Sequence, residues 1–427
     1  MLKTTSELAR DRCTSNLRIL LFDLSIRGHH PSYIKYLIRY WQTQQLPGHL
    51  DIVTSPLFLD EHADVVALAD DSQSIQFTPI TAAEEAALRD RSTGVNRLKR
   101  SFQEWSLFCQ YSAALKASES LILYFDTFQP PISLGMRSPC PFSGIYFRPT
   151  FHYNSFGSSP KPTPQKPSLK AWVQQKRETT SLRRVLYHPQ LQTLFCLDPF
   201  AVQQMDVAYP GSKAVYLPDP VEIHPPVLAE AERLKAELGI EPNRKVCLLF
   251  GALTHRKGVF QLLDAISMLP PVLCQQLCVV LVGESKLVTE LNTRMATIAQ
   301  HKPVQFIHQY EFVADAAIPN YFQMTDIVLA PYQQHVGMSG ILLHAAAAQK
   351  PVLSSDYGLM GEVVRRYKLG LTVDSTRPED IAKGLTQCLL KDSDTLGDRA
   401  RMQAFADENQ AERFASTVFQ HLNVPSM

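Results

Sequence analysis

The chain has 427 residues, with 42 lysines and arginines against 41 aspartates and glutamates, a net charge of +1. One hydrophobic core stops growing at about 250–300 residues, so this length predicts two domains of roughly 200 residues. The balanced charge excludes a global field that would attract nucleic acid. No apolar run reaches the ~18 residues of a membrane span, and the eight cysteines contain no CxxC pair, so we expect reduced thiols in a cytoplasmic protein.

The N-terminal half repeats a unit of apolar strand, loop and helix. LRILLFD (17–23) has strand length, and it precedes the loop SIRGHHPSY and the helical pattern IKYLIRYWQTQ. Further strands are expected from Asp51 and over 120–126, 144–149 and 193–198. Strands that are apolar on both faces and alternate with helices predict a covered parallel sheet, whose carboxyl edge gathers ligands.

The composition changes between Ser155 and Gln190 to Pro, Ser, Lys and Gln. Over 161–184, seven basic side chains accompany a single acidic one, Glu178. We expect a mobile basic loop over about 155–190. It is either a solvated loop without a further role or a contact with an anionic membrane surface at its cytoplasmic face, or with an acidic acceptor, with Trp172 as an interfacial anchor.

The segment YLPDPVE (216–222) predicts the end of the first domain, because two prolines around an acidic turn form a stiff crossing. A second strand–helix series follows it. We therefore predict an α/β protein with two Rossmann-like, doubly wound parallel-sheet domains, 1–218 and 219–400, which face each other across a cleft. Residues 401–427 are expected to form a helix that packs back on the N-terminal domain. The strands of the second series are expected over 246–251, 277–283, 304–310, 325–331, 350–356 and 370–374.

Two loops of the second domain have the residues of an anion site. GALTHRKG follows a strand and enters a helix, so Arg256 and Lys257 stand where two cations can neutralise a diphosphate. VGMSG opens a helix, whose unpaired N–H groups and dipole attract anions. Both loops belong to one edge of the predicted sheet, which favours a single diphosphate site. The N–H groups of the second loop are those of Met338, Ser339 and Gly340.

The first domain has polar candidates after its strands. Asp23 and Asp126 each end an apolar run, where a carboxylate orients an acceptor hydroxyl or simply ends the strand in a turn. In RGHHPSY, Gly28 permits close approach of a sugar to the backbone. His29 and His30 are expected to reach hydroxyls or phosphates, and a helix cap is an equal alternative for His30. We therefore place the acceptor side in this domain.

Several motifs that would indicate other chemistry are absent from the sequence. It has no His/Cys cluster with metal spacing, no GxSxG elbow, no Walker loop and no GxGxxG after the first strand. Hydrolase, ATPase and dehydrogenase functions lose their support. We predict no cofactor and no metal site.

Three segments resemble the retaining glycosyltransferases of the GT-B fold, family 4, also called group 1. They are FGALTHRKGVFQLLDA, TDIVLAPYQ and GILLHAAAAQKPVLSSDYGLMGEVV, with GLTVD and RPEDIAKGL behind them. The resemblance covers most of 240–390, and 17–220 only in outline. It implies that a sugar moves from a nucleotide sugar to a hydroxyl of a glycan, lipid or small metabolite, with retention and without a metal ion.

The resemblance also implies site residues. Arg256 and Lys257 hold the donor diphosphate, and with His152 and Asp126 they are the predicted catalytic residues. His152 would contact the donor sugar, with Arg148 beside it.

The ribose and base side of the donor has two further candidates, His344 and Tyr310. The chain departs from the family at three positions: Val336 and His344 stand where a Glu is usual, and Ala252 where an Arg is favoured. Two alternatives therefore stay open. One is a degenerate GT-B fold that binds nucleotide or a partner protein without catalysis, and the other is a GT-B epimerase acting on the nucleotide sugar itself.

Overall fold

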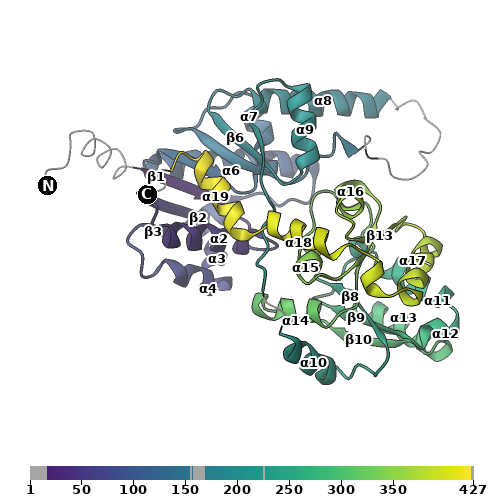
Figure 1. Cartoon of the computed structure of the whole chain (residues 1–427). Coiled ribbons are helices and arrows are strands. Elements are labelled where there is room, and N and C mark those ends of the chain that lie inside the picture. The colour runs from purple at the N-terminus through teal and green to yellow at the C-terminus, as the bar shows by residue number, and fades with distance from the viewer. Residues whose placement is uncertain (1–16, 154–155, 157–168, 225–226, 425–427) are drawn as a thin grey trace. The chain divides into compact units, whose positions relative to one another are not determined.

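The computed structural model describes residues 17–153, 156, 169–224 and 227–424, with the backbone alone for 169–177. The chain divides into two compact units (Figure 1). Of the described residues, unit 1 holds 17–152, 169–220 and 411–424, and unit 2 holds the remainder. The chain passes into unit 2 after Pro220 and returns to unit 1 after Gln410.

Unit 1 is built on a seven-stranded sheet with the order β3-β2-β1-β4-β5-β6-β7, in which every pairing is parallel. Its central strands are buried along almost their whole length, as the unbroken apolar runs predict. The strands are β1 (Arg18–Phe22), β2 (His49–Thr54), β3 (Ile75–Pro79), β4 (Glu119–Ile122), β5 (Phe142–Tyr146), β6 (Leu191–Cys196) and β7 (Ala214–Tyr216).

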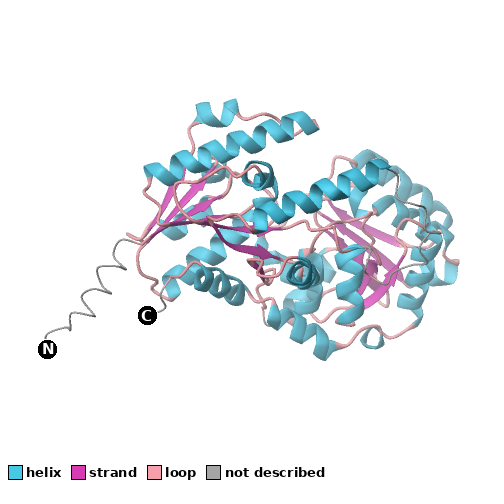
Figure 2. Ribbon diagram, turned by 90° about the horizontal axis from the view of Figure 1, so that it is seen from above, coloured by secondary structure: helices cyan, strands magenta, loops and turns pink. Residues whose placement is uncertain are grey.

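Helices cover both faces of this sheet (Figure 2). On one face, Tyr33 and Trp41 of α2 pack with Phe414 and Phe419 of α19 over the strands. On the other face, α6, α8 and α9 enclose a second apolar cluster, with Trp105 among its largest side chains. The helices are α2 (His30–Thr43), α3 (Pro56–Glu61), α4 (Ala63–Val66), α5 (Ala82–Ala87), α6 (Gly94–Ala114), α7 (Gln129–Ser133), α8 (Leu169–Leu186), α9 (Pro199–Ala208) and α19 (Ala411–His421), with the 3-10 helices η1 (Ala67–Ala69) and η2 (Phe125–Phe128).

The basic loop expected over 155–190 needs a correction. Of its residues, 154–155 and 157–168 lie outside the described part of the chain, but 169–186 form helix α8. Leu182, Val185 and Leu186 of this helix are buried in the core of unit 1. Their spacing of three and four is helical, and the Lys, Gln and Arg residues that precede them in the helix obscure it in the sequence.

The C-terminal segment also differs from the prediction of one helix. It forms α18 (Arg399–Glu408) in unit 2 and α19 in unit 1. Between them, buried Asn409 donates from its side chain to the carbonyl of Phe405, and its own carbonyl accepts from the N–H of Val221. This polar residue ends α18 and holds it beside the crossing segment, whereas α19 lies beside α2 (Figure 1).

Unit 2 contains a six-stranded parallel sheet with the order β10-β9-β8-β11-β12-β13. Helices α11, α13 and α17 pack their apolar sides on one face. The strands are β8 (Lys245–Phe250), β9 (Leu277–Val282), β10 (Gln305–Gln309), β11 (Ile327–Ala330), β12 (Val352–Ser355) and β13 (Gly370–Val373). The helices are α10 (Leu228–Glu237), α11 (Val259–Met268), α12 (Pro271–Cys274), α13 (Val288–His301), α14 (Ile318–Gln323), α15 (Gly340–Ala347), α16 (Gly358–Arg366), α17 (Pro378–Leu390) and α18, with the 3-10 helices η4 (His255–Lys257), η5 (Asp315–Ala317) and η6 (Ser393–Thr395).

The strand order reverses at one place in each sheet. In unit 1 the chain builds outward from β1 through β2 and β3, and then continues on the other side with β4. In unit 2 the same reversal lies between β8 and β11. The loops after two such strands leave in opposite directions, and ligands of open α/β sheets bind in the crevice between them. The fold thus singles out one crevice in each unit.

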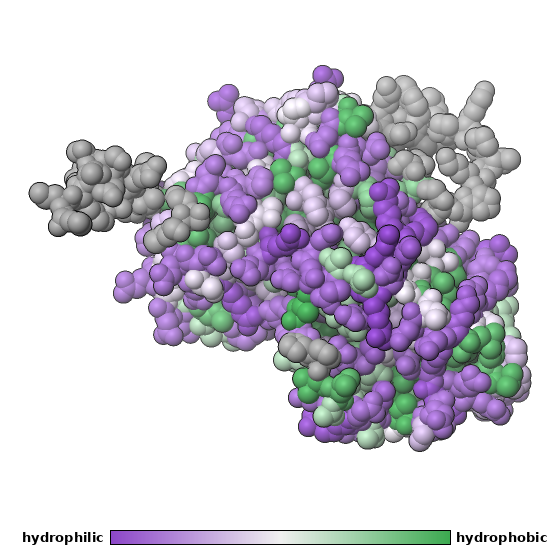
Figure 3. Space-filling view, in the orientation of Figure 1, coloured by the Kyte–Doolittle hydropathy of each residue, from purple (hydrophilic) through white to green (hydrophobic). Residues whose placement is uncertain are grey.

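The surface of the molecule gives fewer indications of a ligand site than the strand order does. Figure 3 shows a mostly hydrophilic face with hydrophobic side chains in small separate groups. Among the described residues, no helix has the length and apolar character needed to span a membrane. The seven cysteines of the described ranges form no disulfide, and all except Cys109 are buried.

Candidate functional site

The crevice of unit 2 has a buried cation on its β8 side. Lys257, in η4, is only 6% exposed, and its ammonium donates to the carbonyl of Phe250 at 2.8 Å and to the hydroxyl of Tyr332. It also lies 4.4 Å from the centre of the Tyr332 ring, a cation–π distance. A side chain at Gly251 would place Cβ 3.0 Å from the ammonium nitrogen, so the glycine makes room for the folded-back lysine.

The β11 side of this crevice supplies backbone donors. After β11 the chain passes Tyr332 and turns at Gly337, with a φ of 91°, before Ser339 caps α15 without a side-chain hydrogen bond. In the part of the chain that the structure describes, the N–H groups of Met338 and Ser339 have no acceptor. Such donors at a helix start, reinforced by the dipole, form an anion site.

The two loops are packed directly against each other. Tyr332 joins them, because its hydroxyl lies within hydrogen-bond distance of both Lys257 and the Ser339 hydroxyl, the latter at 3.5 Å. Gly258 adopts a φ of 72°, and a Cβ there would stand 2.0 Å from the Pro331 carbonyl. Exposed Arg256 contacts Nδ1 of His335 at 2.6 Å. The structure therefore brings Arg256, Lys257 and the α15 start together at one crevice.

Tyr153 is a further member that sequence reasoning missed. It belongs to unit 2, and its hydroxyl accepts from the N–H of Gly337 at 2.8 Å. Its ring packs against Gly358 at the start of α16, where a Cβ would come within 2.5 Å of it, and lies near Tyr357. No pattern around residue 153 indicates this contact. Tyr332, by contrast, directly follows a predicted strand, so the topology rule could have identified it.

The structure places the two predicted ribose and base contacts, His344 and Tyr310, in different surroundings. His344 is on α15, with its ring 5.2 Å from that of Phe322. Tyr310 follows the edge strand β10, two strands from β8, and its hydroxyl donates to Asn292 at 2.7 Å. The structure thus does not bring Tyr310 together with Lys257.

The crevice of unit 1 contains a carboxylate–imidazole pair. Asp23 directly follows β1 and is 2% exposed. One of its oxygens accepts from the N–H of Ser25 at 2.9 Å, and the other lies 2.6 Å from Nδ1 of His30, the first residue of α2. The imidazole meets the edge of Tyr124, which follows β4, and stacks on Phe147, which follows β5. Residues after three strands therefore meet at the reversal point.

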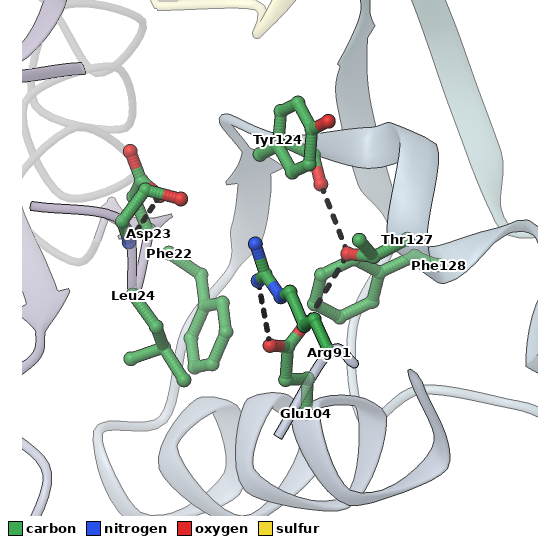
Figure 4. A pocket seen from close by; sticks show the side chains of 9 residues that line it. Phe22, Asp23, Leu24, Arg91, Glu104, Tyr124, Thr127 and Phe128 are labelled. Carbon is green, nitrogen blue, oxygen red and sulfur yellow. Dashed lines mark hydrogen bonds and ion pairs between the residues drawn. The ribbon is translucent and has the colours of Figure 1, made fainter. Parts of the chain in front are cut away.

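A small pocket, about 10 Å³ in volume, opens beside this pair (Figure 4). Figure 4 shows the Arg91 side chain between Asp23 and Tyr124. Arg91 is bound at 3.0 Å by Glu104, a buried carboxylate that also accepts from Arg100 at 2.6 Å and from Thr127 at 3.1 Å. The Arg91 side chain is 43% exposed, so it is positioned by Glu104 and still open to solvent.

The environment shifts the pKa of three groups in this crevice. Burial lowers the pKa of His30, but the charge and the hydrogen bond of Asp23 outweigh it, so the pKa is raised from its usual value. Burial raises the pKa of Asp126 to about 6 against an opposing hydrogen bond from the N–H of Phe147. Burial also raises the pKa of Tyr124.

Three predictions for unit 1 need correction. His152 has a side chain with no exposed surface, and its Nε2 lies 2.7 Å from Asp198, the residue that caps α9. It is an internal contact and is not offered to a donor sugar. Asp126 does not end a strand, because β4 stops at Ile122, and its carboxylate accepts from backbone N–H groups after β5. His30 is the first residue of α2 rather than its N-cap, and its side chain makes no capping hydrogen bond; the cap position is that of His29.

The other candidates of unit 1 lie around the same crevice. Gly28 turns with a φ of 81° and is exposed, as is His29, whose ring stacks near that of Tyr33. Exposed Arg148 hydrogen-bonds to Tyr124. Within the described ranges, no three His, Cys, Asp or Glu side chains gather in a way that could hold a metal ion.

Comparison with known proteins identifies the second unit. Residues 230–408 match the model of the family "Glycosyl transferases group 1". This segment belongs to the group 1 glycosyltransferase family. The matched range contains both loops of the unit 2 crevice, and the departures at Ala252, Val336 and His344 also fall within it.

Two curated relatives agree with this family. The D-inositol 3-phosphate glycosyltransferase of Jonesia denitrificans is 26% identical over 231 residues, which cover 52% of this chain and 52% of that protein. The lipopolysaccharide core biosynthesis mannosyltransferase LpsB of Rhizobium meliloti is 28% identical over 182 residues, 39% of this chain and 49% of that protein. The chain spans about half the length of the curated relatives it matches.

The fold is shared along nearly the whole chain. The structure of Anabaena Alr3699/HepE in complex with UDP and glucose matches with a TM-score of 0.62 and 16% identity, covering 95% of this chain and 99% of that one. The two doubly wound parallel-sheet units thus have the GT-B fold, and the predicted fold class is confirmed.

Proposed function

We propose that this protein transfers a sugar from a nucleotide-sugar donor to a hydroxyl acceptor, and that the crevice of unit 2 holds the donor diphosphate. The observation that carries this proposal is the buried charge of Lys257. No carboxylate pairs with it anywhere in the described part of the chain, and its partners are a carbonyl and a phenol. An uncompensated buried ammonium is costly to the fold, so an anionic ligand is the natural partner.

Lys257 has the donor capacity that this role requires. An ammonium group has three hydrogens, and the contacts with Phe250 and Tyr332 use two of them. The third remains for a phosphate oxygen, alongside the N–H groups of Met338 and Ser339. Together these donors stabilise the charge that develops on the departing phosphate, with Arg256 at the exposed side. Preorganised donors of this kind each lower the activation barrier by on the order of 3–4 kcal/mol.

The nature of the donor follows from the relatives. HepE binds UDP and glucose, which supports a nucleoside diphosphate with a hexose on this chain too. Val336 and His344 lack the carboxylates that the family usually has, so the sugar hydroxyls are held by other groups. Retention of configuration and independence from a metal ion are part of this proposal, as for the family that the chain resembles.

The first experiment is a thermal-shift screen against UDP, GDP, ADP and their sugar derivatives. A ligand L stabilises the folded protein by RT ln(1 + [L]/Kd), so about 2.7 kcal/mol is expected at a concentration of 100 Kd. We expect one diphosphate series to raise the unfolding temperature of the full chain. The loss of this shift in Lys257→Met, with Lys383→Met as an exposed control from α17, assigns the binding to the crevice.

Turnover distinguishes the proposed enzyme from the alternatives. Release of nucleoside diphosphate that depends on an added hydroxyl acceptor supports transfer, and the anomeric coupling in the proton NMR spectrum of the product tests retention. Binding without any release would favour a degenerate fold. Conversion of the nucleotide sugar to its epimer without any acceptor would favour the epimerase.

A further inference from the structure

We infer that the Asp23–His30 pair of unit 1 binds the acceptor hydroxyl, with Nε2 of neutral His30 accepting the hydroxyl hydrogen and Asp23 positioning the ring. The inference rests on the proposed function and deepens it, because it assigns the group that aligns the nucleophile. His30 is then a catalytic residue, since it touches the substrate, and Asp23 is a positioning residue.

The location of the pair is the first argument. His30 and Asp23 flank the loop after β1, and Tyr124 follows β4, so the pair lies at the strand-order reversal of the unit 1 sheet. This is the position at which open α/β sheets bind ligands. The donor loops of unit 2 occupy the equivalent position in their own sheet, after β8 and β11.

The hydrogen bond fixes which nitrogen is available. Asp23 Oδ2 lies 2.6 Å from Nδ1 of His30, and a carboxylate only accepts, so neutral His30 carries its proton on Nδ1. Nε2 then has a lone pair. In the described part of the chain, Nε2 has no hydrogen-bond partner. It is not one of the fully buried atoms without a partner, and the His30 side chain is 13% exposed.

The walls around the imidazole suit a polyhydroxylated ring. Tyr124 stands edge-on at 5.4 Å and Phe147 stacks at 5.9 Å, and both are partly exposed. Aromatic surface of this kind packs against the C–H faces of saccharides and cyclitols. An acceptor with a hydroxyl at Nε2 therefore meets apolar surface on either side of it.

Protonation of the imidazole would block this role. Imidazolium donates from Nε2, so it would bind the electron pair with which the hydroxyl oxygen attacks the anomeric carbon. The groups that act on the ring are Asp23 and Asp126, which favour the charged form, and Arg91, which opposes it together with burial. Tyr124, beside the ring, has a pKa raised above its usual alkaline value and stays neutral. Because the pKa of His30 is raised, transfer is expected to fail at a higher pH than for a free imidazole.

The experiment compares the pH profiles of kcat/KM for the acceptor in the full chain and three variants. In the wild type we expect an acid limb set by His30. Asp23→Asn removes the charge that raises the pKa, so the limb moves to lower pH. His30→Gln abolishes the limb and lowers kcat/KM about 100-fold. His49→Gln, an exposed residue at the start of β2, serves as the control and should match the wild type.

Two further measurements keep the result interpretable. The thermal shift with the nucleoside diphosphate should be the same in all four proteins, because the donor site is in unit 2, and each protein must unfold above the assay temperature. An unchanged limb and unchanged kcat/KM in His30→Gln would overturn the inference and leave the proposed function standing. A wild type that binds the diphosphate but releases none with any acceptor would overturn both.

Discussion

The two crevices share a topology and differ in their charges. In unit 2 the buried ammonium of Lys257 is held by a carbonyl and a phenol, beside amides that have no acceptor in the described ranges. In unit 1 two acidic groups are matched with basic side chains, Asp23 with His30 and Glu104 with Arg91 and Arg100. An unmatched cation suits a ligand with permanent negative charge, whereas a matched pair with a titrating imidazole suits a neutral hydroxyl. In the proposed function, similar sheets thus serve different halves of one transfer reaction.

The largest effect is expected from the unmatched cation. Lys257→Met should lower turnover by about 100- to 1000-fold, because one preorganised donor to the leaving phosphate is lost. The unligated protein should unfold at a similar temperature, since methionine fills the space without an uncompensated charge. Steady-state rates of diphosphate release and circular dichroism melting provide the two numbers.

Lys383→Met is the matched control for this variant, since Lys383 is exposed on α17 and, among the described residues, pairs with Asp380 alone. It should retain wild-type turnover. If Lys257→Met also retained it, the ammonium would be a structural group, and the charge contrast between the crevices would lose its functional meaning. A strongly lowered unfolding temperature would show instead that the lysine stabilises the fold.

The fold was largely predictable because its strands are continuous apolar runs. Runs such as LRILLFD and LCVVLVG are buried on both faces, which gives a signal that needs no tertiary information. Helix α8 was missed because polar residues separate its few buried side chains. The break between α18 and α19 depends on Asn409, whose contact with Val221 joins positions far apart in the chain.

A smaller effect is expected from the group that joins the two donor loops. Tyr332→Phe removes the hydroxyl shared by Lys257 and Ser339 but keeps the ring under the ammonium. A hydrogen bond to a charged group contributes about 1.5–3 kcal/mol, so we expect at least tenfold weaker binding of the nucleoside diphosphate. Isothermal titration calorimetry measures this directly.

Tyr367→Phe is the control for the same chemical change within unit 2, since its hydroxyl bonds to Glu408 on α18. Its affinity for the diphosphate should equal that of the wild type. Equal affinity in Tyr332→Phe would mean that the loops hold their positions without the phenol. The Gly258 contact with the Pro331 carbonyl would then be the element that sets the crevice.

The site was less predictable than the fold because its members meet only in three dimensions. Arg256, Lys257 and the amides of the VGMSG loop could be proposed from local sequence, since each stands at the end of a strand or the start of a helix. Tyr153 could not, because its contact with Gly337 spans 184 positions. His152 was misjudged because the sequence does not show that Asp198 encloses it.

The smallest effect on activity is expected at the opposite edge of the unit 1 sheet. Glu119 begins β4 and is 8% exposed, and its Oε1 has no partner within the described ranges. Burial raises the pKa of its carboxyl to about 7, against an opposing hydrogen bond from Asn423. An unfolded glutamate titrates near 4.3, so the folded state keeps its proton over a pH range in which the unfolded chain loses it.

Glu119 should therefore cost the fold nothing below about pH 4. As the pH rises from there toward 7, this group should lower the free energy of unfolding by up to about 1.4 kcal/mol per pH unit. Glu119→Gln removes this decline, which urea unfolding at pH 5 and pH 7.5 detects as a smaller difference between the two free energies of unfolding. Its kcat/KM profile should keep the acid limb of the wild type, because the carboxyl lies at the amino edge of the strands. A displaced limb would mean that Glu119 at the amino edge influences the titration of His30 at the carboxyl edge. The contrast between a catalytic edge and a structural edge would then be wrong.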